Sequence, residues 1–164
     1  MIRSGLEALS RTVLGGLPLI GWVLEAKAAS QPNDPRWRLS NTEWKQRLSP
    51  AAYRVLRLEA TEHPFTSPLN QEKRSGVYHC AGCRLALFSS TAKFDSGTGW
   101  PSFWKPLEGA VATKVDFKLI VPRTEYHCRR CGGHQGHVFN DGPKPTGLRY
   151  CNNGVALVFE TGPR

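Results

Sequence analysis

Alternating apolar and polar residues predict extended strands in the second half of the chain. Three stretches combine β-branched or aromatic residues with polar neighbours: residues 76–79, 115–121 and 155–160. Such alternation is typical of strands with one buried face. Glycine-rich stretches at residues 97–99 and 132–133 separate them, and glycine clusters favour turns. This half of the chain is therefore predicted to be mainly β.

Two helix-start signals precede the strands. Ser40 is followed three residues later by Glu43, which matches a capping box. Ser49 precedes Pro50, and proline is favoured at the first helical position. Apolar residues then recur at helical spacing as far as Leu56. We therefore expect two short helices before the β-rich body.

The first 28 residues have the pattern of a signal peptide. Arg3 and Arg11 precede an uncharged, mostly apolar run at residues 12–24, and Ala26 and Ala28 supply the small residues that a signal peptidase reads. The run is shorter than the roughly 20 residues that a spanning helix needs, so no stable membrane anchor is expected. A core helix is the alternative, but the glycines and the proline in the run disfavour it.

Three regions follow from this pattern: a signal peptide at 1–28, a linker at 29–39 and one domain at 40–164. The length of 164 residues suits a single domain with a short extension. If the N-terminal segment is cleaved, we expect a periplasmic or secreted protein, and otherwise a cytoplasmic one.

The net charge of +9 raises the question of nucleic-acid binding. The basic residues are scattered, however, and no run of lysine and arginine reaches the length of a nucleic-acid tail. We therefore attribute the charge mainly to a solvated surface and expect no nucleic-acid partner. The 16 glycines and 12 prolines agree with a turn-rich β domain.

Four of the five cysteines form two Cys-x-x-Cys pairs, Cys80 with Cys83 and Cys128 with Cys131. Two residues between cysteines let both thiolates reach one ion from a tight turn, and two such pairs complete a tetrahedral, structural zinc site. Three alternatives stay open. The pairs could be redox-active, they could form structural disulfides in an exported protein, or the second pair could bind a metal with two nearby histidines.

The fifth cysteine, Cys151, has no cysteine partner in sequence. In an extended chain Arg149, Cys151 and Asn153 share a face, and a guanidinium beside a thiol favours the reactive thiolate. Asn153 would then orient a polar substrate group or satisfy the backbone. An inert, buried cysteine is an equally good interpretation, because free cysteines are among the most buried residues.

Two further stretches contain candidate functional residues. His134 and His137 lie in a glycine-rich stretch after the second cysteine pair, where they are either catalytic, metal-binding or ordinary surface histidines. Trp100 and Phe103 belong to an aromatic run in a glycine-rich turn. That run either lines a pocket for an apolar group or packs in the core.

Together these motifs resemble the B-type methionine sulfoxide reductases, which act on the R epimer of methionine sulfoxide. The resemblance covers residues 40–160, and the matching stretches occur in family order: 76–78, 87–88, 93–103, 128–139, 141–143 and 149–153. It implies a mainly β fold of two antiparallel sheets with short N-terminal helices, stapled by a four-cysteine zinc site away from the active centre.

By this resemblance, Cys151 is the nucleophile that attacks the sulfoxide sulfur, leaving methionine and a sulfenic acid on Cys151. His134 and His137 match the positions that protonate the leaving oxygen. Arg149 and Asn153 match supporting positions. The implied substrates are oxidised proteins or peptides that contain methionine R-sulfoxide.

The glycine-rich aromatic turn contains residues that match the family's substrate-binding position and one residue that departs from the family. Trp100 matches the residue that receives the substrate methyl group, and Phe103 is expected to bind substrate beside it. Many family members carry a second, resolving cysteine where this chain has Thr98. With the other cysteines in zinc, an external thiol, such as a thioredoxin-like protein, is expected to regenerate Cys151. Asn152 also departs from the commoner isoleucine, and we expect an effect on packing.

Two other functions stay open. A zinc-ribbon-like module that binds nucleic acid would explain the paired cysteines and the positive charge, but it leaves residues 149–153 without a role. A thiol oxidoreductase would use the Cys-x-x-Cys pairs directly, which zinc ligation would prevent.

Overall fold

The computed structural model describes residues 34–162. The expected signal peptide at 1–28 and the first part of the linker lie outside these residues. Across the described range, no helix combines the length and the apolar character that crossing a membrane requires. A 3-10 turn, η1 (Pro35–Trp37), brings Trp37 against Trp44 with ring centroids 6.3 Å apart. The end of the expected linker therefore packs against the domain.

Both helices begin where the sequence signals predicted. Helix α2 (Asn41–Arg47) starts after Ser40, whose side chain forms a reciprocal capping box with Glu43. Helix α3 (Pro50–Leu58) starts after Ser49, whose hydroxyl accepts a hydrogen bond from a backbone N–H in the first turn. These caps satisfy donors that a helix start leaves unpaired.

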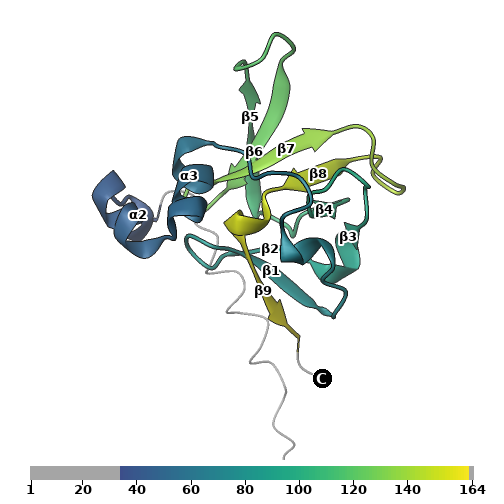
Figure 1. The fold of residues 1–164 in the computed structure, drawn as a ribbon, viewed down its shortest axis with the longest axis horizontal. Coiled ribbons are helices and arrows are strands. Elements are labelled where there is room, and N and C mark those ends of the chain that lie inside the picture. Colours follow the sequence, from purple (N-terminus) through teal and green to yellow (C-terminus); the bar gives the residue numbers. More distant parts are fainter. Residues whose placement is uncertain (1–33, 163–164) are drawn as a thin grey trace, which may run out of the picture.

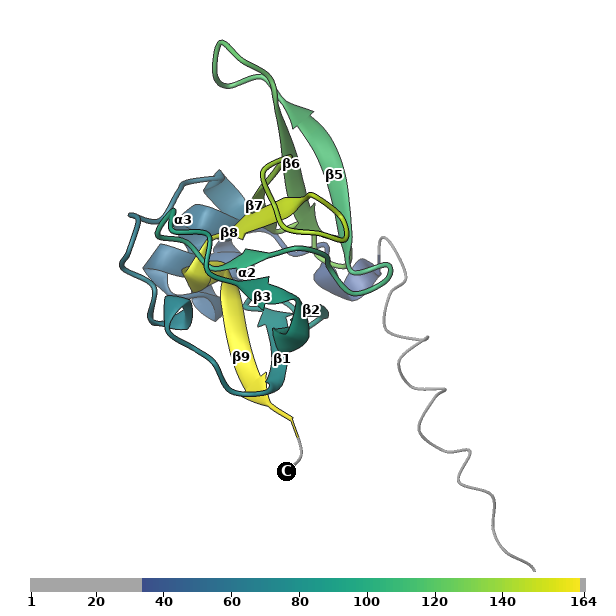
Figure 2. The same ribbon diagram turned by 90° about the vertical axis from the view of Figure 1, so that its right-hand side faces the viewer.

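The strands of residues 34–162 form two antiparallel sheets, shown in Figures 1 and 2. Their bounds are β1 (Gly76–Cys80), β2 (Ala86–Ser89), β3 (Lys93–Phe94), β4 (Ser102–Phe103), β5 (Val111–Asp116), β6 (Arg123–Cys128), β7 (His134–Phe139), β8 (Arg149–Asn152) and β9 (Leu157–Thr161). One sheet has the order β2-β1-β9 and the other β3-β4-β8-β7-β6-β5. The predicted fold class is confirmed.

The strand prediction for residues 115–121 is only partly right. Strand β5 ends at Asp116, and the following residues form the tip of a hairpin that projects from the body (Figure 1). Phe117 is 74% exposed and Ile120 is 102% exposed. The chain has to reverse here to reach β6, and Pro122 has no N–H to donate to a strand ladder. The apolar residues thus occupy a solvent-facing turn.

An aromatic core joins the two sheets behind β4 and β8. Phe88 of β2 stacks on Phe103 of β4 with ring centroids 4.2 Å apart, and Tyr78 of β1 meets Phe103 edge-on at 4.9 Å. All three side chains are fully buried. This packing fixes β4, and through it β8, against the three-stranded sheet.

Candidate active site and metal centre

The four paired cysteines come together between the ends of the two sheets. Cys80 ends β1 and Cys128 ends β6, while Cys83 and Cys131 lie in the turns that follow. All four are buried, and their sulfur atoms lie within 4.8 Å of one another. The sulfur separations are 3.7 Å for Cys80–Cys131 and 3.5 Å for Cys83–Cys128. A zinc ion with sulfur bonds of about 2.3 Å has ligands roughly 3.8 Å apart, so the set fits tetrahedral zinc.

The alternatives to a four-cysteine site do not fit the geometry. All five cysteines are free, and the Cys80–Cys131 and Cys83–Cys128 sulfur separations far exceed the roughly 2.05 Å of a disulfide bond. A local site with the two histidines is not formed either. His134 contacts Glu125 and His137 contacts Asp116, each through a ring nitrogen.

Gln135 connects this cluster to the strand that carries Cys151. Its side chain is fully buried, and Nε2 donates to the Sγ of Cys80 at 3.5 Å. Its backbone oxygen accepts two hydrogen bonds of 2.9 Å from Asn153, one from the backbone and one from Nδ2. The end of β8 is therefore tied to the first cysteine turn through one residue.

Cys151 lies in the middle of the six-stranded sheet and lines a pocket of about 120 Å³. Across the ladders its direct neighbours are His137 on β7 and Ser102 on β4. Opposite residues of an antiparallel pair share a face, which explains why His137 lines the same pocket as Cys151. Trp100 and Asn153 complete the set of sequence-predicted residues that line it.

The Cys151 thiol is half-buried, and two neighbours oppose the effect of that burial. Burial raises the pKa of Cys151 above its usual value, whereas the Arg149 guanidinium and a hydrogen bond from Thr98 lower it. Arg149 is itself held by Asp141, with Nε and Nη2 donating to the carboxylate at 2.8 and 2.9 Å. The expected effect of Arg149 is thus present, but burial is the larger cause.

The two predicted histidines share a face only because β7 contains an irregularity. Residues three apart in a regular strand point to opposite faces. The register between β6 and β7 shifts at Gln135, and a bulge of this kind redirects side chains. The rings of His134 and His137 consequently lie 5.5 Å apart. His137 lines the pocket, whereas His134 is 2% exposed and does not line it.

His137 is oriented by a carboxylate that sequence reasoning missed. Its Nε2 lies 2.7 Å from Asp116 Oδ2, and Arg123 donates to the same oxygen at 2.8 Å. Burial lowers the pKa of His137, while the Asp116 hydrogen bond raises it. A hydrogen bond from the backbone N–H of Lys118, followed by those from His137 and Arg123, holds the pKa of Asp116 well below its usual range. The available signal was the single acidic residue of the stretch 115–121, where Lys118 is the only other charged residue.

Both ends of the Asn153 side-chain amide form hydrogen bonds to backbone groups, so the amide is not free to bind a substrate. Its Oδ1 accepts from the backbone N–H of Glu62 at 2.8 Å, and its Nδ2 donates to Gln135. Trp100 Nε1 donates to the backbone oxygen of Glu62 at 2.9 Å. Both residues therefore anchor the segment after α3 at the pocket rim.

Phe103 is a correction to the predicted substrate site. Its side chain has no exposed surface and does not line the pocket beside Cys151. Alternation along β4 places its neighbour Ser102 opposite Cys151, so Phe103 points to the other face and packs in the aromatic core.

The fold is thus mainly β, with a closed four-cysteine cluster and a separate, half-buried thiol that faces an imidazole on the neighbouring strand. The SelR domain family matches residues 48–161. A peptide methionine sulfoxide reductase MsrB of Pseudomonas savastanoi pv. phaseolicola is 56% identical over 116 residues, covering 70% of this chain and 88% of the relative. That of Agrobacterium fabrum is 48% identical over 132 residues, with 80% and 98% covered.

The chain belongs to the B-type methionine sulfoxide reductase family and is an enzyme that reduces methionine sulfoxide. A plant relative, the chloroplastic peptide methionine sulfoxide reductase B1 of Arabidopsis thaliana, is 51% identical over 120 residues, which cover 73% of this chain and 59% of that protein.

Proposed function

We propose that this enzyme reduces the R epimer of methionine sulfoxide in oxidised proteins, with Cys151 as the nucleophile. The observation that carries the proposal is the placement of the Cys151 thiol, His137 and Trp100 around one pocket. The thiolate attacks the sulfoxide sulfur, and the oxygen is transferred to Cys151. Cys–SH and the sulfoxide become Cys–SOH and the thioether, so atoms and electrons balance.

The sulfoxide oxygen needs a proton during this transfer, and His137 is the group best placed to supply it. Its ring lines the pocket opposite Cys151, and Asp116 accepts from Nε2 and stabilises the charged form. The ring centres of His134 and His137 lie 5.5 Å apart, and His134 does not line the pocket. Trp100 forms the wall against which the substrate methyl group packs.

The catalytic cycle uses one cysteine and an external thiol. The four other cysteines gather at the proposed zinc site, and Thr98 contacts Cys151 where a resolving cysteine would stand. Two external thiols, such as those of a thioredoxin-like protein, reduce Cys–SOH to Cys–SH and water and become a disulfide. Cys80, Cys83, Cys128 and Cys131 would hold a zinc ion in a closed site, where it would stabilise the fold and take no part in this cycle.

The Cys151→Ser variant tests the nucleophile. We expect reduction of methionine R-sulfoxide by a dithiol to fall below detection, because the hydroxyl of serine is not ionised at neutral pH, while zinc content and Tm stay near the wild-type values. The measurement supplies both sulfoxide epimers separately. Retained turnover in the variant, or equal consumption of the S epimer by the wild type, would contradict the assignment.

Mass spectrometry after one turnover without reductant tests the one-cysteine cycle. The expected product carries one added oxygen, trapped as a sulfenic acid adduct on Cys151. A disulfide between Cys151 and any of the other cysteines would reject the cycle.

We also propose that residues 1–28 direct export and are removed, which would place the mature enzyme in the periplasm or outside the cell. The support is the pattern of residues 1–28 alone. N-terminal sequencing of protein from its native source decides the matter, since an intact Met1 would exclude cleavage.

A further inference from the structure

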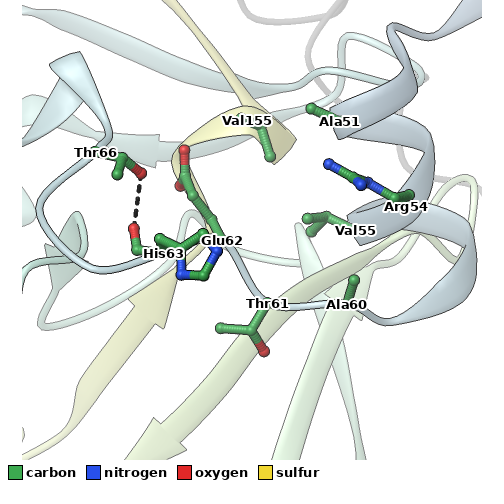
Figure 3. A pocket seen from close by; sticks show the side chains of 9 residues that line it. All are labelled: Ala51, Arg54, Val55, Ala60, Thr61, Glu62, His63, Thr66 and Val155. Atoms are coloured by element: carbon green, nitrogen blue, oxygen red, sulfur yellow. Dashed lines mark hydrogen bonds between the residues drawn. The ribbon is translucent and has the colours of Figure 1, made fainter.

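A second, larger cavity lies next to the catalytic pocket. It is a groove of about 390 Å³ between α3 and residues 60–66, against about 120 Å³ for the pocket beside Cys151. Its floor is apolar and comes from Ala51 and Val55 of α3 and from Val155 of η4 (Gly154–Ala156), as Figure 3 shows. Nothing in the proposed reaction uses this groove.

The groove and the pocket share a wall. Thr61 lines both, and the next residue is fixed to the active site by three hydrogen bonds. The backbone N–H of Glu62 donates to Asn153, and its backbone oxygen accepts from Trp100. Glu62 Oε2 accepts from the backbone N–H of Gly154 at 2.6 Å. A ligand held in the groove is thereby held at a fixed position relative to Cys151.

The two charged side chains that line the groove differ in their partners. The carboxylate of Glu62 is already occupied by Gly154. Arg54 points across the groove toward the space between Val55 and Val155 (Figure 3), and within residues 34–162 no hydrogen bond or ion pair to its guanidinium is found. Arg57, one turn later, does have partners, donating to the backbone of Cys131 and lying over the Trp44 ring. Arg54 is therefore available to an anionic ligand.

We propose that this groove is a subsite for the polypeptide that carries the methionine sulfoxide. The floor takes an aliphatic side chain two positions from the oxidised residue, because alternate side chains of an extended chain point the same way. Arg54 takes an aspartate or glutamate two positions further along, because that side chain faces the same way as the aliphatic one. The proposal rests on the proposed function, in which the substrate is protein-bound, and adds a sequence preference to it.

Synthetic peptides test this preference with dithiothreitol as the only reductant, so that docking of a protein reductant cannot contribute. The peptides have leucine or glycine two positions from the methionine sulfoxide, on either side, and aspartate or lysine two positions beyond the leucine or glycine. We expect kcat/KM to be roughly tenfold higher for leucine, from burial of its side chain. Aspartate should exceed lysine by about two- to fivefold, as a partly exposed ion pair allows.

Two variants test separately the contribution of the apolar floor and that of the Arg54 charge to the peptide preference. Ala51→Trp fills the groove and should remove the leucine preference, while Arg54→Glu should reverse the preference between aspartate and lysine. Arg47→Glu, an exposed charge reversal on α2, is the matched control and should change neither. Circular dichroism confirms that each variant is folded.

N-acetylmethionine sulfoxide, which is too short to reach the groove, distinguishes the possible failures. If the wild type does not reduce it, the proposed function fails. If it is reduced but the peptides show no preference that Ala51→Trp or Arg54→Glu removes, the subsite proposal is overturned. An effect of these variants that appears only with a thioredoxin-like reductant would also overturn it, because the groove would then dock the reductant.

Discussion

At the scale of single residues, the reactivity of Cys151 depends on opposing effects of burial and charge. Burial raises the pKa of the thiol, and Arg149 and Thr98 lower it. Burial is the largest cause, so the surroundings favour the thiol over the thiolate. The thiolate, not the thiol, is the nucleophile, and the chemical step should therefore accelerate as pH rises toward the thiol pKa.

We predict that Arg149→Met moves this pH profile to higher pH. Loss of the guanidinium removes a favourable charge and leaves Asp141 close to the thiol, and both changes raise the pKa of Cys151. Each unit of increase lowers the thiolate fraction about tenfold at pH values below the pKa. Alkylation rates of Cys151 between pH 6 and 10 measure the shift. Arg47→Met is the control, and an unchanged profile in Arg149→Met would show that Arg149 has only a structural role.

At the scale of elements, the hairpin of β5 and β6 supplies charged groups near the pocket that Cys151 lines. Asp116 at the end of β5 and Arg123 at the start of β6 face each other across the ladder. Together they reach His137 on the neighbouring strand β7. The exposed apolar tip of the hairpin thus begins directly beyond two residues that contact the active site.

We predict that Asp116→Asn lowers kcat about tenfold with little change in Tm. Asparagine keeps a similar shape and an acceptor oxygen, but it removes the charge that raises the pKa of His137. The protonated fraction of His137 falls, and proton donation to the sulfoxide oxygen weakens. An NMR titration of the histidines reads the pKa directly.

Glu108→Gln, an exposed carboxylate removed in the same way, serves as the control for Asp116→Asn. If the pKa of His137 is unchanged while kcat falls, Asp116 does not act through this imidazole.

At the scale of the whole molecule, the four-cysteine cluster links the two sheets. Cys80 ends a strand of the three-stranded sheet and Cys128 ends a strand of the six-stranded sheet. A zinc ion bound by both would act as a cross-link over the long intervening segment, and metal binding energy adds to folding stability.

We predict that Cys80→Ser loses zinc and lowers Tm by about 10 °C or more, since a structural ion contributes several kcal/mol in a domain of this size. Metal analysis and thermal unfolding are the measurements, and a chelator should destabilise the wild type in the same direction. Cys151→Ser is the matched control, with the same substitution at a cysteine outside the cluster. Full zinc content in Cys80→Ser would reject the four-cysteine site.

The sequence by itself determined where the two helices and the first strand begin, and it identified the paired cysteines as metal ligands. The capping box at Ser40, the proline at position 50 and the alternation at residues 76–79 act over a few neighbouring residues, so their outcome can be read locally. The spacing within Cys-x-x-Cys is equally local. It predicted that both cysteines of a pair bind the same ion, and that the two pairs together complete one site.

Only the tertiary structure decided which residues surround Cys151. The register of β7 against β8 places His137 opposite the thiol, and the shift at Gln135 turns His134 to the same side. Asp116 reaches the site from another hairpin, whereas Phe103, next to a residue opposite Cys151, turns into the core. Strand pairing between distant segments sets these positions, and no pattern within a single segment encodes it.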